Sequence, residues 1–225
     1  MARIDPIVRL IEARASREHD GLLRRLRTME SSDGPWIVID SRQLLNFSSN
    51  DYLGLAGHPD VRAALKRAAD EHGVGATSAH LICGHRMPHA ALEDVLAQWT
   101  GRERALLFST GYMANLGVIS ALLGAGDVCV QDKLNHACLL DGARLAGCVL
   151  KRYPHGDVEA ARRQLKASPD AAAMLVTDGV FSMDGDIAPL RELAALAREQ
   201  EATMLVDDAH GLGVLGRNGG GSATE

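Results

Sequence analysis

The sequence predicts an α/β protein with a mostly parallel sheet, preceded by an N-terminal helical segment. Three observations predict it. Short apolar runs alternate with helical patterns of about 10 to 15 residues, as strands joined by crossover helices do. Hydrophobic residues make up 46% of the 225 residues but aromatic residues only 4%, which favours helices layered on a sheet over a β-sandwich. Gly, Pro, Asn and Asp stand where the helical patterns start and stop.

The first 45 residues are predicted to be a helical segment with a short β element. The apolar residues that recur at spacings of three and four are Ile4, Ile7, Val8, Ile11, Leu22, Leu23 and Leu26. They predict that the first 30 residues are helical. Residues 31–35 (SSDGP) break this pattern, and short β segments are predicted over 36–40 and 44–47.

Residues 46–225 are predicted to form part of a larger α/β domain. The predicted helices cover 59–71, 88–100, 112–123, 135–146, 157–166 and 190–200, with Pro59 in a first turn, Gly101 and Gly124 as stops, and Asn135 and Asp157 as caps. The predicted strands cover 105–108, 128–131, 148–153, 173–177 and 203–206. Residues 73–84 are rich in Gly, Ser and Thr and are predicted to be irregular.

Charge and composition exclude several classes of protein. The net charge of −5 and the pI near 6.0 give no reason to expect a nucleic-acid partner. No apolar run approaches the roughly 20 residues that span a bilayer, and the charged N-terminus lacks the apolar core of a signal peptide. The four cysteines show no CxxC pairing, which indicates buried free thiols in a reducing cytoplasm. We therefore expect a cytoplasmic protein that binds neither membranes nor nucleic acid.

Ligands of parallel sheets bind beyond the carboxyl ends of the strands, so the residues that follow each strand are the candidate site. Gly111 and Tyr112 follow 105–108 at a helix start, where free N–H groups suit a phosphate, although an ordinary capped turn has the same pattern. His136 follows 128–131 and could stack on a flat ring or carry a proton; a surface histidine is the alternative. Ser182 lies in the turn after 173–177 and could donate to a ligand oxygen.

The last predicted strand ends in an acid–imidazole pair. Asp207 closes an apolar run and His210 follows three residues later, so both could face one pocket. A metal site would need a third ligand that the sequence does not assign. Residues 211–216 spell GxGxxG, but a loop rather than a helix follows, which disfavours a dinucleotide site. Residues 184–186 (DGD) lack the other ligands of a calcium loop and indicate a turn.

Five segments resemble motifs of the α-oxoamine synthases, which are fold-type-I enzymes that use pyridoxal 5′-phosphate (PLP). They are 45–55 (LNFSSNDYLGL), 106–122 (LLFSTGYMANLGVISAL), 134–145 (LNHACLLDGARL), 177–186 (TDGVFSMDGD) and 205–216 (LVDDAHGLGVLG). The resemblance runs from about residue 9 to residue 222. It implies the large domain of a three-layer PLP-dependent transferase and a homodimer.

The resemblance also implies residue roles. Backbone N–H groups of Gly111 and Tyr112 would hold the phosphate, and Ser182 and His210 would bond the phenolic oxygen. His136 would stack on the ring and contact substrate. Asp207 would pair with the ring nitrogen, where an anion keeps the nitrogen protonated. His136, Asp207 and His210 are thus the implied catalytic residues.

Two further residues are implied to contact substrate. Asn50 would approach the active site of the partner subunit, and Arg24 would bind substrate, although Arg25 or Arg27 could be in register instead. The segment 75–80 (GATSAH) departs from the Gly/Ser-rich form common in the family, so the choice of acyl chain stays open.

Several reactions occur within the family. The motifs are most similar to enzymes that join L-alanine to a pimeloyl thioester, on CoA or a carrier protein, in biotin synthesis. Alternatives are the condensation of glycine with acetyl-CoA or succinyl-CoA, of serine with palmitoyl-CoA, and a non-catalytic partner subunit without the lysine.

The family's lysine that binds PLP covalently lies downstream of the 205–216 motif, in a segment that the sequence does not reach. We therefore expect a truncated form without the C-terminal domain, and no covalent PLP–lysine link in this chain alone. The chain's own lysines are Lys66, Lys133, Lys151 and Lys166.

Overall fold

The computed structural model describes residue 3 and residues 5–224. Ile4, which belongs to the predicted N-terminal helical pattern, lies outside the described residues. The chain divides into two compact units, Met1–His58 (unit 1) and Pro59–Glu225 (unit 2), and each is described by itself.

Unit 1 begins with helix α1, Pro6–His19. The side chain of Asp5 caps this helix by accepting a hydrogen bond from the N–H of Ile7 at 2.8 Å. The helix ends at His19 because Gly21 adopts a positive φ of 69° and the N–H of Leu22 turns back to the carbonyl of Arg17 at 2.7 Å. The prediction that the helix continues through Leu22, Leu23 and Leu26 is wrong, since this glycine stop overrides the apolar spacing.

A three-stranded antiparallel sheet follows in unit 1. It consists of β1 (Met29–Asp33), β2 (Trp36–Ile39) and β3 (Arg42–Leu45). The predicted break at residues 31–35 begins too early, because residues 31–33 belong to β1. Only Gly34 and Pro35 form the turn between the paired residues Asp33 and Trp36. After a short 3₁₀ turn, Leu55–Gly57, the unit ends. None of its described residues is buried.

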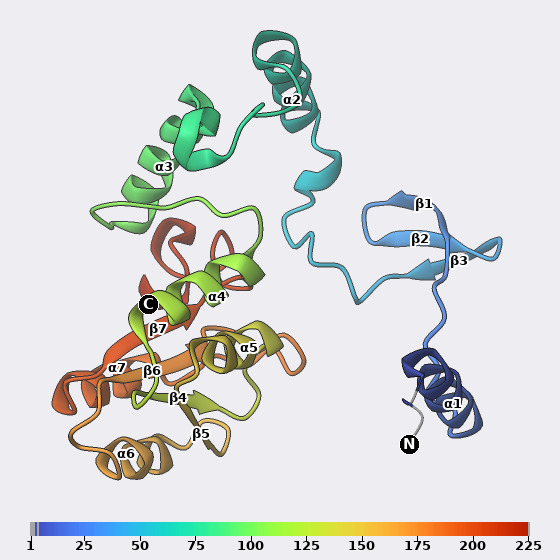
Figure 1. Cartoon of the computed structure of the whole chain (residues 1–225). Coiled ribbons are helices and arrows are strands. Elements are labelled where there is room, and N and C mark those ends of the chain that lie inside the picture. The colour runs from blue at the N-terminus through green and yellow to red at the C-terminus, as the bar shows by residue number, and fades with distance from the viewer. Residues whose placement is uncertain (1–2, 4, 225) are drawn as a thin grey trace. The chain divides into compact units, whose positions relative to one another are not determined.

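Unit 2 contains a four-stranded parallel sheet in the order β5-β4-β6-β7 (Figure 1). The strands are β4 (Val128–Asp132), β5 (Val149–Tyr153), β6 (Ala173–Asp178) and β7 (Thr203–Asp207). Neighbouring strands of this sheet all pair in parallel. The predicted α/β class and parallel sheet are therefore confirmed.

The six predicted helices of unit 2 are all present within a few residues of their expected ends. They are α2 (Pro59–His72), α3 (Met87–Thr100), α4 (Gly111–Leu122), α5 (Ala137–Ala146), α6 (Val158–Lys166) and α7 (Leu190–Glu199). Short helical turns cover His80–Gly84, Arg217–Gly219 and Ser222–Thr224. The first of these is a π-helical turn inside the stretch that was predicted to be irregular.

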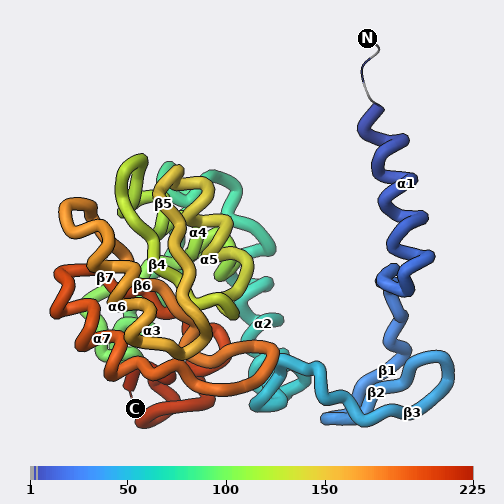
Figure 2. Tube along the Cα trace, turned by 90° about the horizontal axis from the view of Figure 1, so that it is seen from below, coloured from blue at the N-terminus to red at the C-terminus, as the bar shows by residue number. Residues whose placement is uncertain are grey.

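The sheet of unit 2 is the middle of three layers. Alternate residues of each strand face opposite sides: Val128 and Val130 pack in a cluster with α6 and α7, whereas Cys129 packs in a cluster with α4 and α5. Figures 1 and 2 show these helix pairs on the two faces. A sheet buried on both faces explains why its strands read as continuous apolar runs.

The predicted strand at 105–108 is not a strand in the structure. Leu106 is 80% exposed, and the N–H of Leu107 donates to the side chain of Glu93 at 3.2 Å rather than to a neighbouring strand. A short apolar run becomes a strand only where a partner strand meets it, and this stretch pairs with no strand in the part of the chain that the structure describes.

All four cysteines are free. Cys129 and Cys138 are buried as predicted, whereas Cys148 is only partly buried and the prediction of burial is wrong for Cys83, which is exposed. The helices among the described residues include none long and apolar enough to cross a membrane.

Candidate active site

A cavity of about 140 Å³ lies at the carboxyl ends of β4, β6 and β7. The residues that line it are Gly111, Tyr112, His136, Cys138, Asp178, Ser182, Asp207, Ala209 and His210. They include every residue of unit 2 that the sequence assigned to the site. A larger hollow of about 690 Å³ adjoins the cavity, since Gly111, Asp207 and Ala209 line both.

Asp207 is the last residue of β7 and is partly buried. Its Oδ2 accepts a hydrogen bond from the side-chain amide of Asn115 at 2.7 Å, and its Oδ1 accepts one from the N–H of Ala209 at 3.1 Å. Both donors are neutral, so neither cancels the negative charge of the carboxylate. That charge can hold a cation in the cavity, such as a protonated ring nitrogen.

His136 is fixed at the N-terminus of α5. It is the N-cap residue itself, and its Nδ1 accepts from the N–H of Cys138 at 3.3 Å and lies 2.8 Å from the Cys138 thiol. The prediction that Asn135 caps this helix is wrong. Asn135 is buried and instead joins β4 to β6, donating to the carbonyl of Val176 and accepting from the N–H of Asp178.

Asp178 is a site residue that the sequence analysis did not assign. It ends β6, directly beside Asp207 in the ladder, and its carboxylate accepts from the N–H of His136 at 3.2 Å. Burial raises the pKa of Asp178 to about 6; the charge of Asp207 adds to the rise and the His136 N–H opposes it. Asp178 follows an apolar run, as Asp207 does. The same pattern could therefore have predicted Asp178 as a site residue, but the prediction was made for Asp207 alone.

Gly111 and Tyr112 open helix α4. The cap residue Thr110 accepts from the N–H of Met113 at 3.1 Å, which leaves the first-turn N–H groups of Gly111 and Tyr112 without an acceptor inside the helix. These N–H groups and the positive end of the helix suit a phosphate. The Tyr112 hydroxyl donates to Asp141 at 2.7 Å, and this bond raises the pKa of Tyr112.

Ser182 lies in a tight turn after β6. Two backbone hydrogen bonds close the turn: the N–H of Phe181 donates to the carbonyl of Asp186 at 3.0 Å, and the N–H of Gly185 donates to the carbonyl of Phe181 at 2.8 Å. His155 holds it from outside: its Nε2 lies 2.8 Å from Asp186, and its Nδ1 lies 3.1 Å from the buried Asp132 at the end of β4. The turn therefore presents Ser182 to the cavity from a fixed position.

The segment after β7 wraps around Asp208, whose carboxylate accepts from the N–H and the hydroxyl of Ser222 at 2.9 and 2.5 Å. A Cβ on Gly179, Gly211 or Gly221 would come within about 2.6 Å of this carboxylate, so glycine is required there. The GxGxxG sequence of residues 211–216 is therefore part of the turn around Asp208. Residues 217–219 form only a 3₁₀ turn. The prediction that no α-helix follows the motif is confirmed at these residues.

Arg24 and Asn50 lie in unit 1, where both are exposed, and their substrate roles stay predictions. Of the three arginines that compete for the substrate position, Arg25 pairs with Glu18 at 3.0 Å.

The donor set of the cavity fits PLP. The Asp207 carboxylate, whose hydrogen bonds come from the neutral groups of Asn115 and Ala209, could hold a protonated ring nitrogen. The first N–H groups of helix α4 could bind a phosphate. A histidine locked by Cys138 and two hydroxyl or imidazole donors line the remainder of the cavity.

Comparisons with known proteins give one family. The family described as aminotransferase class I and II matches residues 42–223. Curated relatives named 8-amino-7-oxononanoate synthase include that of Alkalilimnicola ehrlichii, 56% identical over 94% of this chain and 54% of its own length. That of Stenotrophomonas maltophilia is 56% identical over 99% of this chain and 55% of its own length. The chain thus spans about half the length of the curated relatives it matches.

Solved structures give the same fold. A serine palmitoyltransferase of Sphingomonas wittichii matches with a TM-score of 0.88 at 36% identity, over 99% of this chain and 56% of that one. A serine palmitoyltransferase structure described as containing PLP matches with a TM-score of 0.86 at 35% identity, over 96% of this chain and 55% of that one. The 8-amino-7-oxononanoate synthase of Francisella tularensis matches with a TM-score of 0.66 at 32% identity, over 79% of this chain and 49% of that one.

Proposed function

Because the chain belongs to the family of class I and II aminotransferases, whose solved relatives hold PLP, we propose that it serves the activity for which its curated relatives are named. That activity condenses L-alanine with pimeloyl-CoA, or with a pimeloyl-carrier protein. It releases the thiol and CO₂ and yields 8-amino-7-oxononanoate for biotin synthesis.

The observation that carries this proposal is the level of identity across the chain. The curated 8-amino-7-oxononanoate synthases are 55–56% identical over at least 94% of it, whereas the serine palmitoyltransferases are 35–36% identical over a similar share. Fold likeness does not separate the two activities, since both share the architecture. The remaining alternatives within the family are the condensation of glycine with acetyl-CoA or succinyl-CoA and a non-catalytic partner subunit without the lysine.

Six of the residues that line the cavity have a role in this reaction. PLP supplies a ring that withdraws electrons from the α-carbon of a bound amino acid. Asp207 would hold the proton on the ring nitrogen, and His136 would pack against the ring. The N–H groups of Gly111 and Tyr112 would bind the phosphate, while Ser182 and His210 would hydrogen-bond the phenolic oxygen. These residues would thereby orient the bound amino acid for the incoming thioester.

The lysines of the chain do not serve as the covalent anchor of PLP. No lysine is among the residues that line the cavity. Lys151, on β5, donates to the hydroxyl of Ser168 at 2.8 Å and so ties the strand to the end of α6. The chain of 225 residues is therefore expected to bind PLP without a covalent link.

The experiment has two parts. The chain is incubated with PLP and borohydride, and the intact mass is measured; a stoichiometric PLP–lysine adduct contradicts the assignment of the lysines. The whole protein is then assayed for release of free CoA from three mixtures: alanine with pimeloyl-CoA, glycine with acetyl-CoA, and serine with palmitoyl-CoA. A higher kcat/KM with either of the last two mixtures overturns the proposed substrate.

We also propose that the whole protein is a cytoplasmic homodimer in which Asn50 approaches the partner's site and Arg24 contacts substrate. Light scattering of the whole protein gives its mass. The variant Arg24→Ala should raise the KM for the thioester, whereas Arg27→Ala should leave it unchanged.

A further inference from the structure

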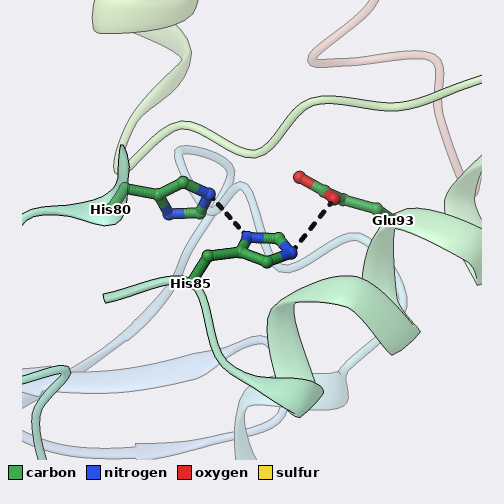
Figure 3. Close-up of side chains that lie close together, drawn as sticks. All are labelled: His80, His85 and Glu93. Atoms are coloured by element: carbon green, nitrogen blue, oxygen red, sulfur yellow. Dashed lines mark hydrogen bonds and ion pairs between the residues drawn. The ribbon is translucent and has the colours of Figure 1, made fainter. Parts of the chain in front are cut away.

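We propose that His80, His85 and Glu93 of unit 2 form a binding site for a Zn²⁺ ion. None of the three lines the strand-end cavity, so the site is independent of the proposed reaction. Figure 3 shows the imidazole of His85 between the imidazole of His80 and the carboxylate of Glu93. The three side chains come from the π-helical turn His80–Gly84, the residue after it, and helix α3.

The geometry of the three side chains is close to that of a metal site. One ligand atom from each residue lies within 4.8 Å of the others. His80 Nε2 is 2.7 Å from His85 Nδ1, and His85 Nε2 is 3.9 Å from Glu93 Oε2. Nitrogen and oxygen ligands sit at about 2.0–2.2 Å from tetrahedral zinc, which places them about 3.3 Å apart. The two contacts use different nitrogens of His85, and an imidazole binds one ion through only one of them. Rotation of the side chains must therefore bring one nitrogen of each imidazole and one carboxylate oxygen, which lie within 4.8 Å of one another, to that spacing.

Glu93 is held as a ligand by a second contact. Its side chain is 19% exposed, and the carboxylate accepts the N–H of Leu107 through Oε1 at 3.2 Å. This bond turns the other oxygen, Oε2, toward His85. In natural metal sites, hydrogen bonds of this kind orient the side chains that bind the ion.

His89 lies beside the three ligands as a neighbouring imidazole. Its ring centroid is 5.3 Å from that of His80 and 5.8 Å from that of His85. It lies four residues before Glu93 on α3, and therefore on the same face of that helix. Its Nδ1 accepts the N–H of Arg86 at 3.0 Å, which leaves Nε2 as the nitrogen for an ion.

The charge and chemistry of the group favour a divalent transition metal. Imidazoles prefer zinc, copper, nickel and iron over magnesium and calcium, which take oxygen ligands. The nearby cation Arg86 does not occupy the carboxylate, because its guanidinium donates to the carbonyls of His72 and Gly75 at 2.6 and 3.1 Å.

From the sequence, a transition-metal site was considered only at Asp207 and His210, and the spacing of His80, His85 and Glu93 matches no common zinc motif. They converge only through the fold. The turn brings the N–H of His85 within 3.1 Å of the His80 carbonyl, and α3 then returns Glu93 to the same place.

The test titrates the EDTA-treated chain with ZnCl₂ by isothermal titration calorimetry. We expect one ion per chain with a Kd on the order of micromolar or tighter. The variants His85→Ala and Glu93→Gln should each lower the affinity at least tenfold, and MgCl₂ should give no binding heat. Thermal unfolding provides a second measurement: zinc should raise the Tm of the parent chain and not that of His85→Ala.

Two control variants sharpen the result. His72→Ala removes a histidine that pairs with Glu71 at 3.8 Å without a second imidazole, and it should keep the affinity within twofold. Cys83→Ser removes the exposed thiol of the same turn and should also keep it. Unchanged zinc affinity in His85→Ala and Glu93→Gln, with circular dichroism showing intact helices, overturns the site. So does loss of binding in Cys83→Ser, which would assign the ion to the thiol.

Discussion

At the scale of single residues, the site depends on carboxylates that end apolar strands. Asp207 was identifiable from sequence because it follows an apolar run and precedes His210. Asn115, which donates to it, is 92 residues upstream in the middle of α4 and has no local signal. The sequence therefore reveals groups at strand ends, whereas their partners appear only once the helices are packed.

The charge of Asp207 is testable with the substitution Asp207→Asn. We expect the affinity of the chain for PLP to fall at least tenfold, or by about 1.4 kcal/mol, because a neutral amide cannot hold a protonated ring nitrogen. Equilibrium dialysis measures the affinity. The exposed Asp170, changed to Asn, is the matched control and should bind PLP as the parent does. Equal affinity in both variants would remove Asp207 from the site.

Asp178 predicts a dependence of stability on pH. Its pKa is raised to about 6 in the folded chain by burial, against an ordinary value of 3.8. The folded state therefore holds the proton more tightly than the unfolded state, so the contribution of Asp178 to stability is lost as the pH rises from about 4 to about 6. At neutral pH this loss is at most about 3 kcal/mol.

The variant Asp178→Asn should accordingly be more stable than the parent at pH 7, with the difference vanishing near pH 4. Urea unfolding from pH 4 to pH 8 measures it, and the difference between the two curves isolates this one group. A difference that does not change with pH would show that Asp178 ionises as it does in water.

At the scale of elements, helices α4 and α5 position Asn115 through a close approach at Gly142. A Cβ on Gly142 would lie 2.9 Å from Ile119 Cδ1 and 3.2 Å from the carbonyl of Asn115. Gly142→Ala gains about 1 kcal/mol of helix propensity, but overpacking costs about 1–3 kcal/mol. We expect a net loss of stability and weaker PLP binding, because the helices must separate where Asn115 holds Asp207.

The control for this variant is Gly117→Ala on α4. There the added Cβ would meet only the ring edge of Phe108 at 3.1 Å, and that ring is 42% exposed and free to move. Urea unfolding and equilibrium dialysis of both variants give the comparison. Equal effects of the two substitutions on PLP affinity would contradict the role of the Gly142 contact.

His155 joins two loops of unit 2 and gives a second pH dependence, which has the same direction as that of Asp178 but lies at higher pH. Burial lowers its pKa, but the hydrogen bonds to Asp132 and Asp186 outweigh burial and the net pKa is raised. Its contribution to stability is therefore fully present below its unfolded pKa of about 6.5 and is lost as the pH rises through the folded value.

His155→Gln should thus lower stability by about 1 kcal/mol at pH 5.5 and by less at pH 8.5. Urea midpoints at the two pH values test this, with His72→Gln, whose partner Glu71 is exposed, as the control. An equal loss at both pH values would mean that the loops are joined by packing against Phe181 rather than by charge.

The elements of unit 2 could be predicted because propensity, apolar pattern and capping residues agree there. Asp157 caps α6 and Gly101 ends α3, both as the sequence indicated. The failures occurred where a partner decides the structure. Residues 105–108 have strand composition without a paired strand, and Met29–Asp33 is a strand that has polar residues but pairs with β2. Pairing is a tertiary property, and local pattern does not contain it.

At the scale of the whole chain, burial is confined to unit 2. The sheet is covered on both faces by apolar clusters, whereas no described residue of unit 1 is buried. Since burial of apolar surface supplies most of the free energy of folding, unit 2 should account for the measured stability of the chain.

Deletion of residues 1–58 should therefore leave the Tm within about 2 °C, because for a chain of this size about 1 kcal/mol corresponds to 2–4 °C. Hydrogen exchange of the intact chain provides an independent measurement: the amides of β4 and β6 should exchange slowly and those of α1 rapidly, since slow exchange requires global opening of a packed core. A fall in Tm of more than about 5 °C on deletion, or slow exchange in α1, would mean that unit 1 buries apolar surface in solution. The apolar side chains of α1, of which Ile7 and Ile11 are 60% and 63% exposed, would then be the first candidates for that contact.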